Sequence, residues 1–258
     1  MRIIERLGHK INEAADTAGF GIILMVRATA YLRVLFRPLS YRAFLDQMGT
    51  ACVEAIPVVM VVSVFVGMIL TLNGGLSLSS FGQNSLIGRV VAVAMIREMG
   101  PFMTSLILAA SIGSAMAAEI GTMVVSEEVD ALHAMAIDPA KFLVMPRLLA
   151  MAVLCPLMTV YSSITGIAGG AVLANTQLGV SFAVFRNDAL TSLIMKDLWT
   201  GLFKAFVFGV VIATVACAQG LRARGGAIGV GYATRRTVVI SFILIIIFGY
   251  YITWFFYR

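Results

Sequence analysis

The sequence predicts an all-α membrane protein, and its composition, hydropathy and apolar patterning all support that fold class. Of its 258 residues, 60% are hydrophobic and only 12% are charged, whereas a soluble domain has roughly half apolar and about a quarter charged residues. The mean hydropathy is +0.97. Long apolar windows recur along the chain, and about 20 apolar helical residues cross a hydrocarbon core of about 30 Å. We therefore expect helices that carry the chain through a bilayer several times.

Five windows meet this length requirement, and together they make residues 51–258 a predicted transmembrane region of five helices. Four windows contain no charged residue, namely 55–72, 99–118, 148–173 and 238–256. The remaining window, 198–219, is interrupted only by Lys204. Small residues four apart, such as Gly166 and Gly170, let transmembrane backbones approach closely, and we expect this packing within one chain.

Residues 1–50 are predicted to form an N-terminal interfacial helical arm. In residues 1–19, Ile3, Ile4 and Leu7 begin an apolar series at helical spacing, with charged side chains on the other side. This pattern is typical of a helix that lies in the membrane interface with its cations toward lipid headgroups. We favour that location over a helix that packs on the protein itself.

The positions of the basic residues predict the orientation of the chain. They gather before the first window and between the last two, as Arg2, Arg6, Lys10, Arg27, Arg33, Arg37 and Arg42, then Arg222, Arg224, Arg235 and Arg236. Basic loops stay cytoplasmic, so the N-terminus and the loops 119–147 and 220–236 are expected inside and the C-terminus outside. The formal net charge of +6 is thereby assigned to the membrane surface, and no nucleic acid is expected as a partner.

An arginine and a glutamate stand next to each other within apolar sequence, at Arg97 and Glu98 of "REMGP". Residues 86–118 are too long for one straight span at 1.5 Å per residue, and Pro101 can break a helix. We predict a partly inserted segment, 86–98, that leads into a transmembrane helix from about residue 99.

Charges at membrane depth cost several kcal/mol unless they are paired or hydrated, so Arg97 and Glu98 need an explanation. Our functional interpretation is a polar rim on a cavity for an amphipathic molecule, with Arg97 available to an anionic headgroup. Alternatively, the two residues satisfy each other, or neighbours such as Arg89, and only fix the packing of the segment.

The loop after the second window predicts a short cytoplasmic helix at about residues 126–137. Ser126 is a possible N-cap, and Glu127, Glu128 and Asp130 suit the positive first turn. Pro139 would end the helix and hold Asp138 extended.

One apolar stripe runs along this predicted helix, through Val129, Leu132 and either Met135 or Ala136. It would lie on the membrane or dock into a groove of a partner protein. The acidic start disfavours an anionic membrane surface, so we favour the partner and place His133 on the docking face.

Several catalytic motifs are missing from the sequence. There is no GxxxxGK[ST] nucleotide loop, and the glycine-rich stretch 225–231 leads into a transmembrane window instead of following a strand. There is no HExxH motif and no serine–histidine triad. We expect no catalytic residues, no metal site and no cofactor of the chain's own.

Four segments in order carry a family resemblance: "IREMGP", "GSAMAAEIGTM", "SEEVDALHAMAIDP" and "GAIGVGYATRRTVVIS". From about residue 45 to the C-terminus, the chain resembles the MlaE family of ABC transporter permeases, which includes the bacterial Mla and YrbE permeases and a plastid counterpart. The resemblance implies an N-terminal interfacial helix, five transmembrane helices and a homodimer. It also implies a separate cytoplasmic ATPase that binds the ATP, and a lipid-carrying MCE-domain protein on the outer side.

The resemblance also implies two sets of site residues. The lipid-binding set, at a cavity in the dimer interface, would be Leu70, Asn73, Arg97 and Glu98. The ATPase-coupling set would be Glu127, Glu128, Asp130, Leu132, His133, Asp138 and Pro139. This chain departs from the family pattern in having Ser111, where many relatives carry an arginine, and Glu128, where the usual residue is glutamine.

The expected function is therefore a permease that moves phospholipid between a bacterial inner membrane and a periplasmic MCE-domain carrier. A plastid location is disfavoured because no Ser- and Arg-rich transit segment is seen. One alternative is an ion-coupled secondary transporter that uses Glu98, although five spans do not divide into two inverted repeats. Another is an intramembrane lipid enzyme, which would need a cluster of catalytic side chains.

Overall fold

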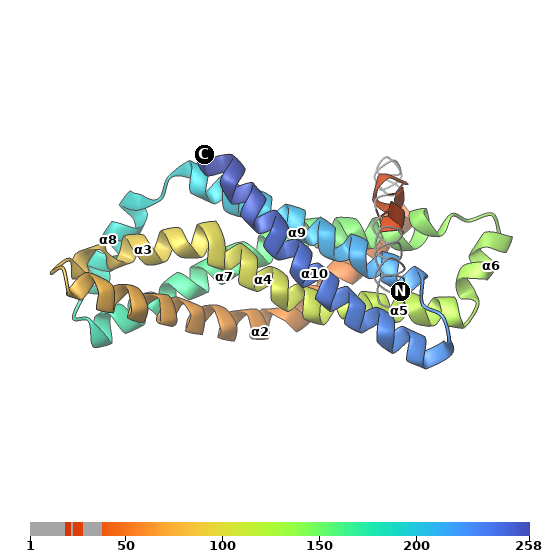
Figure 1. Cartoon of the computed structure of the whole chain (residues 1–258), viewed down its shortest axis with the longest axis horizontal. Helices are drawn as coiled ribbons and strands as arrows, with labels where there is room; N and C mark the ends of the chain where they lie inside the picture. The colour runs from red at the N-terminus through yellow and green to blue at the C-terminus, as the bar shows by residue number, and fades with distance from the viewer. Residues whose placement is uncertain (1–18, 22, 28–37) are drawn as a thin grey trace, which may run out of the picture. The chain divides into compact units, whose positions relative to one another are not determined.

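The computed structural model describes residues 19–21, 23–27 and 38–258, and these residues form helices and no strands (Figure 1). The interfacial helix predicted within residues 1–19 lies, but for Gly19, outside the described residues. The prediction of an N-terminal arm over residues 1–50 therefore stays a prediction.

Nine α-helices and four shorter helical turns follow one another from residue 38 onward. The α-helices are α2 (Pro38–Ser79), α3 (Ile87–Ala94), α4 (Gly100–Leu108), α5 (Ser114–Val125), α6 (Glu128–Ala134), α7 (Met145–Gln177), α8 (Phe182–Ser192), α9 (Met195–Leu221) and α10 (Gly226–Tyr257). The turns are a 3₁₀ turn, η2 (Asn84–Leu86), and three π-helical turns, η3 (Met95–Met99), η4 (Ala109–Gly113) and η5 (Ala140–Val144).

Five helical stretches of the described residues are long and apolar enough to cross a membrane. They are Cys52–Ser79, Asn84–Val125, Ala140–Gln177, Met195–Leu221 and Gly226–Tyr257. Each contains one of the five apolar windows of the sequence. The predicted all-α, multi-pass membrane fold is thereby confirmed.

The second stretch differs from its prediction, because Gly100 and Pro101 do not break it. The chain stays helical from Asn84 to Val125. The π-helical turn η3 lies directly before the proline and is closed by a hydrogen bond from the Gly100 N–H to the Met95 carbonyl. A wider turn with i→i+5 bonding changes the direction of side chains without ending the helix, so 86–98 is not a separate inserted segment.

The chain divides into two compact units, each built from separate parts of the sequence. Unit 1 comprises Met1–Gly49, Ala109–Met151 and Val210–Phe242. Unit 2 comprises Thr50–Leu108, Ala152–Gly209 and Ile243–Arg258. Several long helices contribute residues to both units.

Unit 2 has a core in which α8 packs along α3 (Figure 1). The buried members of this core are Ile87, Val91, Met95, Ala174, Val180 and Phe185. A side chain at Gly88 would overlap the Phe185 carbonyl, so glycine is required for this approach. The Asp188 carboxylate of α8 accepts the Arg89 N–H at 2.7 Å and so caps the start of α3.

Glycines also bring α2 and α7 of unit 2 into backbone contact. A Cβ added at Gly67 would overlap the carbonyl group of Gly166, and one at Gly170 would lie 2.6 Å from Thr71 Oγ1. The small residues predicted to mediate close packing therefore do so between helices of the same chain.

Replacing Gly67 by alanine is expected to destabilise unit 2 by about 1–3 kcal/mol, because the added methyl group meets backbone atoms that cannot rotate away. The midpoint of thermal unfolding of the detergent-purified protein measures the effect. Gly231→Ala is the matched control, since a Cβ at that helical position of α10 meets nothing within 4 Å. Equal midpoints for both variants would contradict the close contact.

Candidate functional site

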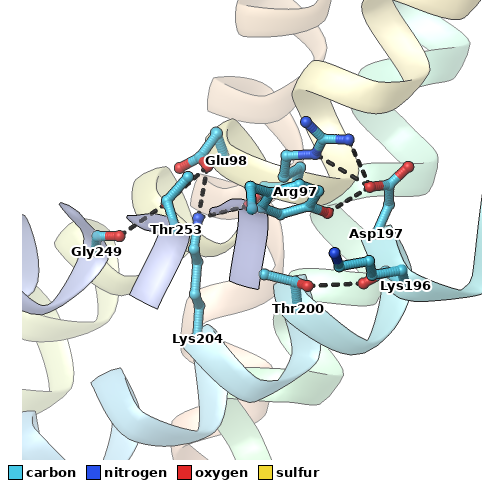
Figure 2. A network of polar contacts seen from close by, with 9 residues as sticks. Arg97, Glu98, Lys196, Asp197, Thr200, Lys204, Gly249 and Thr253 are labelled. Carbon is cyan, nitrogen blue, oxygen red and sulfur yellow. Dashed lines mark hydrogen bonds and ion pairs between the residues drawn. The ribbon is translucent and has the colours of Figure 1, made fainter. Parts of the chain in front are cut away.

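Four charged side chains, a threonine and a tyrosine meet within unit 2 and form what we call the ion-pair network (Figure 2). Its members come from η3, α9 and α10, and are Arg97, Glu98, Asp197, Lys204, Thr253 and Tyr257. These elements lie in the stretches Asn84–Val125, Met195–Leu221 and Gly226–Tyr257, each long and apolar enough to span a membrane. The network therefore places charges where only paired or hydrated groups are tolerated.

The first pair of the network joins Arg97 to Asp197. Asp197 Oδ1 accepts Arg97 Nη2 at 2.6 Å and Nε at 3.1 Å, and the Tyr257 hydroxyl donates to the same oxygen. The guanidinium carbon lies 3.9 Å from the centroid of the Tyr257 ring, a cation–π contact. Because the Asp197 side chain is only 2% exposed, its charge depends on these neighbours for compensation.

The second pair joins Glu98 to Lys204. Lys204 Nζ donates to Glu98 Oε1 at 2.6 Å, and Thr253 Oγ1 lies 2.9 Å from the same oxygen. The Lys204 side chain is 1% exposed, whereas that of Glu98 is 38% exposed. If the pair is broken, water can therefore reach the Glu98 carboxylate but not the Lys204 ammonium group.

Pro101 leaves the backbone carbonyl of Arg97 available as a further acceptor for Lys204. In a regular helix the N–H of residue 101 would donate to the carbonyl of Arg97, but proline has no N–H. Lys204 Nζ donates to that carbonyl at 3.1 Å (Figure 2). The proline that the sequence suggested as a helix breaker therefore exposes a backbone acceptor for a buried cation.

Local geometry explains how neighbours in sequence reach the same helix. Asp197 and Lys204 are seven residues apart and so lie on one face of α9. Gly201, between them, allows close approach, because a Cβ there would overlap the Ile96 carbonyl. With the π-helical turn η3 at this position, both residues pair with α9: Arg97 contacts Asp197, and Glu98 contacts Lys204.

The structure decides which polar partners these residues use. Arg97 and Glu98 do not pair with each other or with Arg89, whose guanidinium lies 3.8 Å from Asp188.

Leu70 packs against the Ile87 core, and Asn73 is exposed on α2. Neither residue takes part in the described contacts of the network, and the lipid-binding role of Leu70, Asn73, Arg97 and Glu98 stays a prediction.

The other members of the network were not identified from the sequence. Lys204 is the lone charge of its apolar window, and a lone cation in apolar surroundings requires an anion. Asp197 lies two helical turns earlier on the same face of α9. These two opposite charges on one face could have predicted that α9 pairs with charged residues of another helix. Nothing local to Thr253 or Tyr257 marks them as partners.

The loop of unit 1 that precedes α7 differs in detail from its prediction. Ser126 does not cap the helix: its hydroxyl lies 3.0 Å from the Thr122 carbonyl and 2.9 Å from Glu128 Oε1. Glu127, with φ +62°, takes the N-cap position, and α6 covers Glu128–Ala134. The helix is therefore shorter than the predicted 126–137, because its start follows a left-handed residue instead of a serine cap.

The apolar stripe of α6 packs on its own chain, which corrects the predicted docking face. Val129 and Leu132 are buried with Leu143, and partly buried side chains complete the cluster: Met123, Val124, Ile137 and Leu221. The exposed residues of α6 are Glu128, Asp130, Ala131, His133 and Ala134, and Met135, directly after the helix, is exposed as well. Any partner of α6 would thus meet an acidic face with one large apolar side chain.

Asp138 and Pro139 mark the start of the next helix after α6. The Asp138 carboxylate accepts the Ala140 N–H at 2.9 Å, and Pro139 directly precedes the π-helical turn η5. Their expected role in coupling stays a prediction. Among the described residues, no group of three or more His, Cys, Asp or Glu side chains could hold a metal ion.

Comparison with known proteins gives consistent matches along most of the chain. A protein-family model described as "Permease MlaE" matches residues 44–255. A probable ABC transporter permease protein of Synechocystis is 35% identical over 224 residues, which are 87% of this chain and 85% of the relative. One from Rickettsia bellii is 33% identical over 259 residues, covering 100% of this chain and 99% of the relative.

A plant relative is also similar. The chloroplastic protein TRIGALACTOSYLDIACYLGLYCEROL 1 of Arabidopsis thaliana is 33% identical over 234 residues, covering 91% of this chain and 67% of the relative.

The unequal exposure of Glu98 and Lys204 predicts unequal effects of replacing them. Glu98→Ala should destabilise the protein by about 3–5 kcal/mol, because it leaves the buried lysine unpaired. Lys204→Met should cost less, since Glu98 can be hydrated, and adding it to Glu98→Ala should recover most of the lost stability. Thermal unfolding of the three detergent-purified variants measures these differences. Additive losses in the double variant would contradict the pairing.

Proposed function

Because the chain belongs to the MlaE permease family and is a multi-pass permease subunit, we propose that it moves phospholipid between a bacterial inner membrane and an MCE-domain carrier. The energy comes from ATP hydrolysis on a separate cytoplasmic ATPase. The ion-pair network is the observation that supports this function most. It is a polar site within helices that can span a membrane, and no catalytic group among the described residues lies in it.

Arg97 is the member of the network suited to a lipid headgroup. Its side chain is 30% exposed, and its bonds to Asp197 use Nε and Nη2, so they do not occupy Nη1. A guanidinium that is already oriented by a carboxylate and an aromatic ring offers its remaining donors to a phosphate in a fixed direction. The name of the plant relative is that of a galactose-bearing diacylglycerol, which supports a lipid as the cargo.

The exposed side of α6 is suited to an ATPase. Glu128 and Asp130 lie in the first helical turn, where acidic side chains complement the positive end of the helix dipole. Together with His133, and with Met135 directly after the helix, they make the exposed surface of α6 acidic, which fits a partner surface lined by basic residues. The sequence itself has no GxxxxGK[ST] loop, which agrees with ATP being bound by the partner.

A second copy of the chain and the orientation in the membrane complete the proposal. Only 28% of the apolar window of Cys52–Ser79 and 17% of that of Gly226–Tyr257 are buried, so these helices offer apolar faces to lipid or to another copy. Together with the family membership, this supports a homodimer. The distribution of basic residues supports a cytoplasmic N-terminus and a periplasmic C-terminus.

Purification of the complex tests the proposed function. The tagged chain is co-expressed with the ATPase and MCE-domain proteins encoded nearest to it, and mass spectrometry identifies the proteins and lipids recovered. An ATPase and bound phospholipid are the expected result. A chain recovered alone, with neither, would contradict the proposal.

Reversing a charge on α6 should separate the ATPase from the permease. Asp130→Arg is expected to lower the recovered ATPase at least tenfold, because like charges opposed across an interface cost several kcal/mol and about 1.4 kcal/mol is already tenfold in affinity. Membrane insertion should be unchanged, since Asp130 is exposed. Glu54→Arg, at an exposed acidic residue of α2, is the matched control. Equal ATPase recovery with both variants would refute α6 as the docking element.

A further inference from the structure

Arg147, in the first turn of α7, is a buried cation of unit 1 that takes no part in the ion-pair network. Its side chain is 7% exposed. Nη2 lies 2.8 Å from Glu119 Oε1 of α5, and Nη1 donates to the Leu143 carbonyl of η5 at 2.9 Å. One guanidinium thus joins the helix before α6 to the helical turn after it.

The same turn carries the contact with α6. The Leu143 side chain packs against Val129 and Leu132, the buried face of α6, while its carbonyl accepts Arg147. A continuous series of contacts therefore runs from α6 through Leu143 and Arg147 to Glu119. One side chain therefore connects α5, which leads into the α6 loop, with the helical turn η5 that follows the loop.

Stability alone is a poor explanation for this arrangement. Arg147 Nε is buried and has no hydrogen-bond partner among the described residues, and an unsatisfied buried donor is unfavourable. The Glu119 side chain is 54% exposed and can be hydrated without a partner, whereas burying the Arg147 guanidinium has a desolvation cost. What an arginine adds is geometry, because its planar fork donates in two fixed directions at once, whereas lysine has a single ammonium group.

We propose that Arg147 is a positioning residue for coupling, which clamps the two sides of the α6 loop so that a displacement of α6 moves α5 and the start of α7 together. This inference rests on the proposed function, in which the ATPase docks on α6. Without the clamp, ATP-driven movement of α6 is absorbed by the loop instead of reaching the membrane-spanning helices.

The ratio of ATP hydrolysed to phospholipid moved, measured with the complete complex in proteoliposomes, tests the clamp. Arg147→Lys keeps the charge but cannot hold both acceptors, and should raise the ratio about fivefold, within the range that mutations of coupling elements produce. Glu119→Gln keeps an oxygen for Nη2 but loses the charge, and should raise it less. Arg224→Lys, at an exposed arginine of unit 1, is the control and should leave the ratio unchanged.

The outcomes separate the clamp from a merely structural role. A structural role would lower both rates together through loss of folded complex, and an unchanged ratio in Arg147→Lys and Glu119→Gln would overturn the clamp. If Arg147→Lys yields no folded complex, Glu119→Gln decides, because the Glu119 side chain is 54% exposed and its replacement is tolerated. A wild-type complex with no ATP-driven lipid movement would overturn the proposed function itself, and with it the clamp.

Discussion

The pairing of charges inside apolar helices is the constraint on which unit 2 depends. Lys204 and Asp197 are almost fully buried, and a buried charge is costly unless it has a partner within hydrogen-bond distance. Their partners are consecutive residues of another helix, which a regular α-helix directs about 100° apart. The local structure of η3 and α9 solves this problem: a π-helical turn redirects Arg97 and Glu98, and Gly201 allows the two helices to approach.

The short sequence "REMGP" can now be explained residue by residue. Arg97 and Glu98 pair with α9, and Pro101 leaves the Arg97 carbonyl to accept Lys204. Gly100 lies where a side chain would overlap the Met95 carbonyl and Ser163, so it permits the wide turn and close packing with α7. A site with so many interdependent parts holds the Arg97 guanidinium in a constant orientation, which supports its proposed role toward an anionic headgroup.

Features that depend on the average hydropathy of long segments could be predicted from the sequence. Features that depend on contacts between residues far apart in the sequence could not. Five apolar windows were enough to identify the five spans, because the cost of exposing polar groups to lipid acts on every residue of a span. The charges at Arg97 and Glu98 were recognised by the same cost, but their partners lie about a hundred positions away on α9, beyond any local pattern. The sequence predicts a docking face at Leu132 because a single apolar stripe on a helix does not reveal whether it packs on its own chain or on another. Pro101 was interpreted as a break because a π-helical turn has no simple sequence signature.

The most direct test of the account is the energy source for lipid movement. The chain is reconstituted in proteoliposomes with its ATPase and MCE-domain partner, and transfer of a labelled phospholipid to or from the carrier is followed with ATP alone or with a proton or sodium gradient alone. Our account predicts transfer that requires ATP and the ATPase and does not respond to either gradient. Gradient-driven transfer by the chain without its ATPase, lost on Glu98→Gln, would contradict it and would identify Glu98 as an ion-coupling residue.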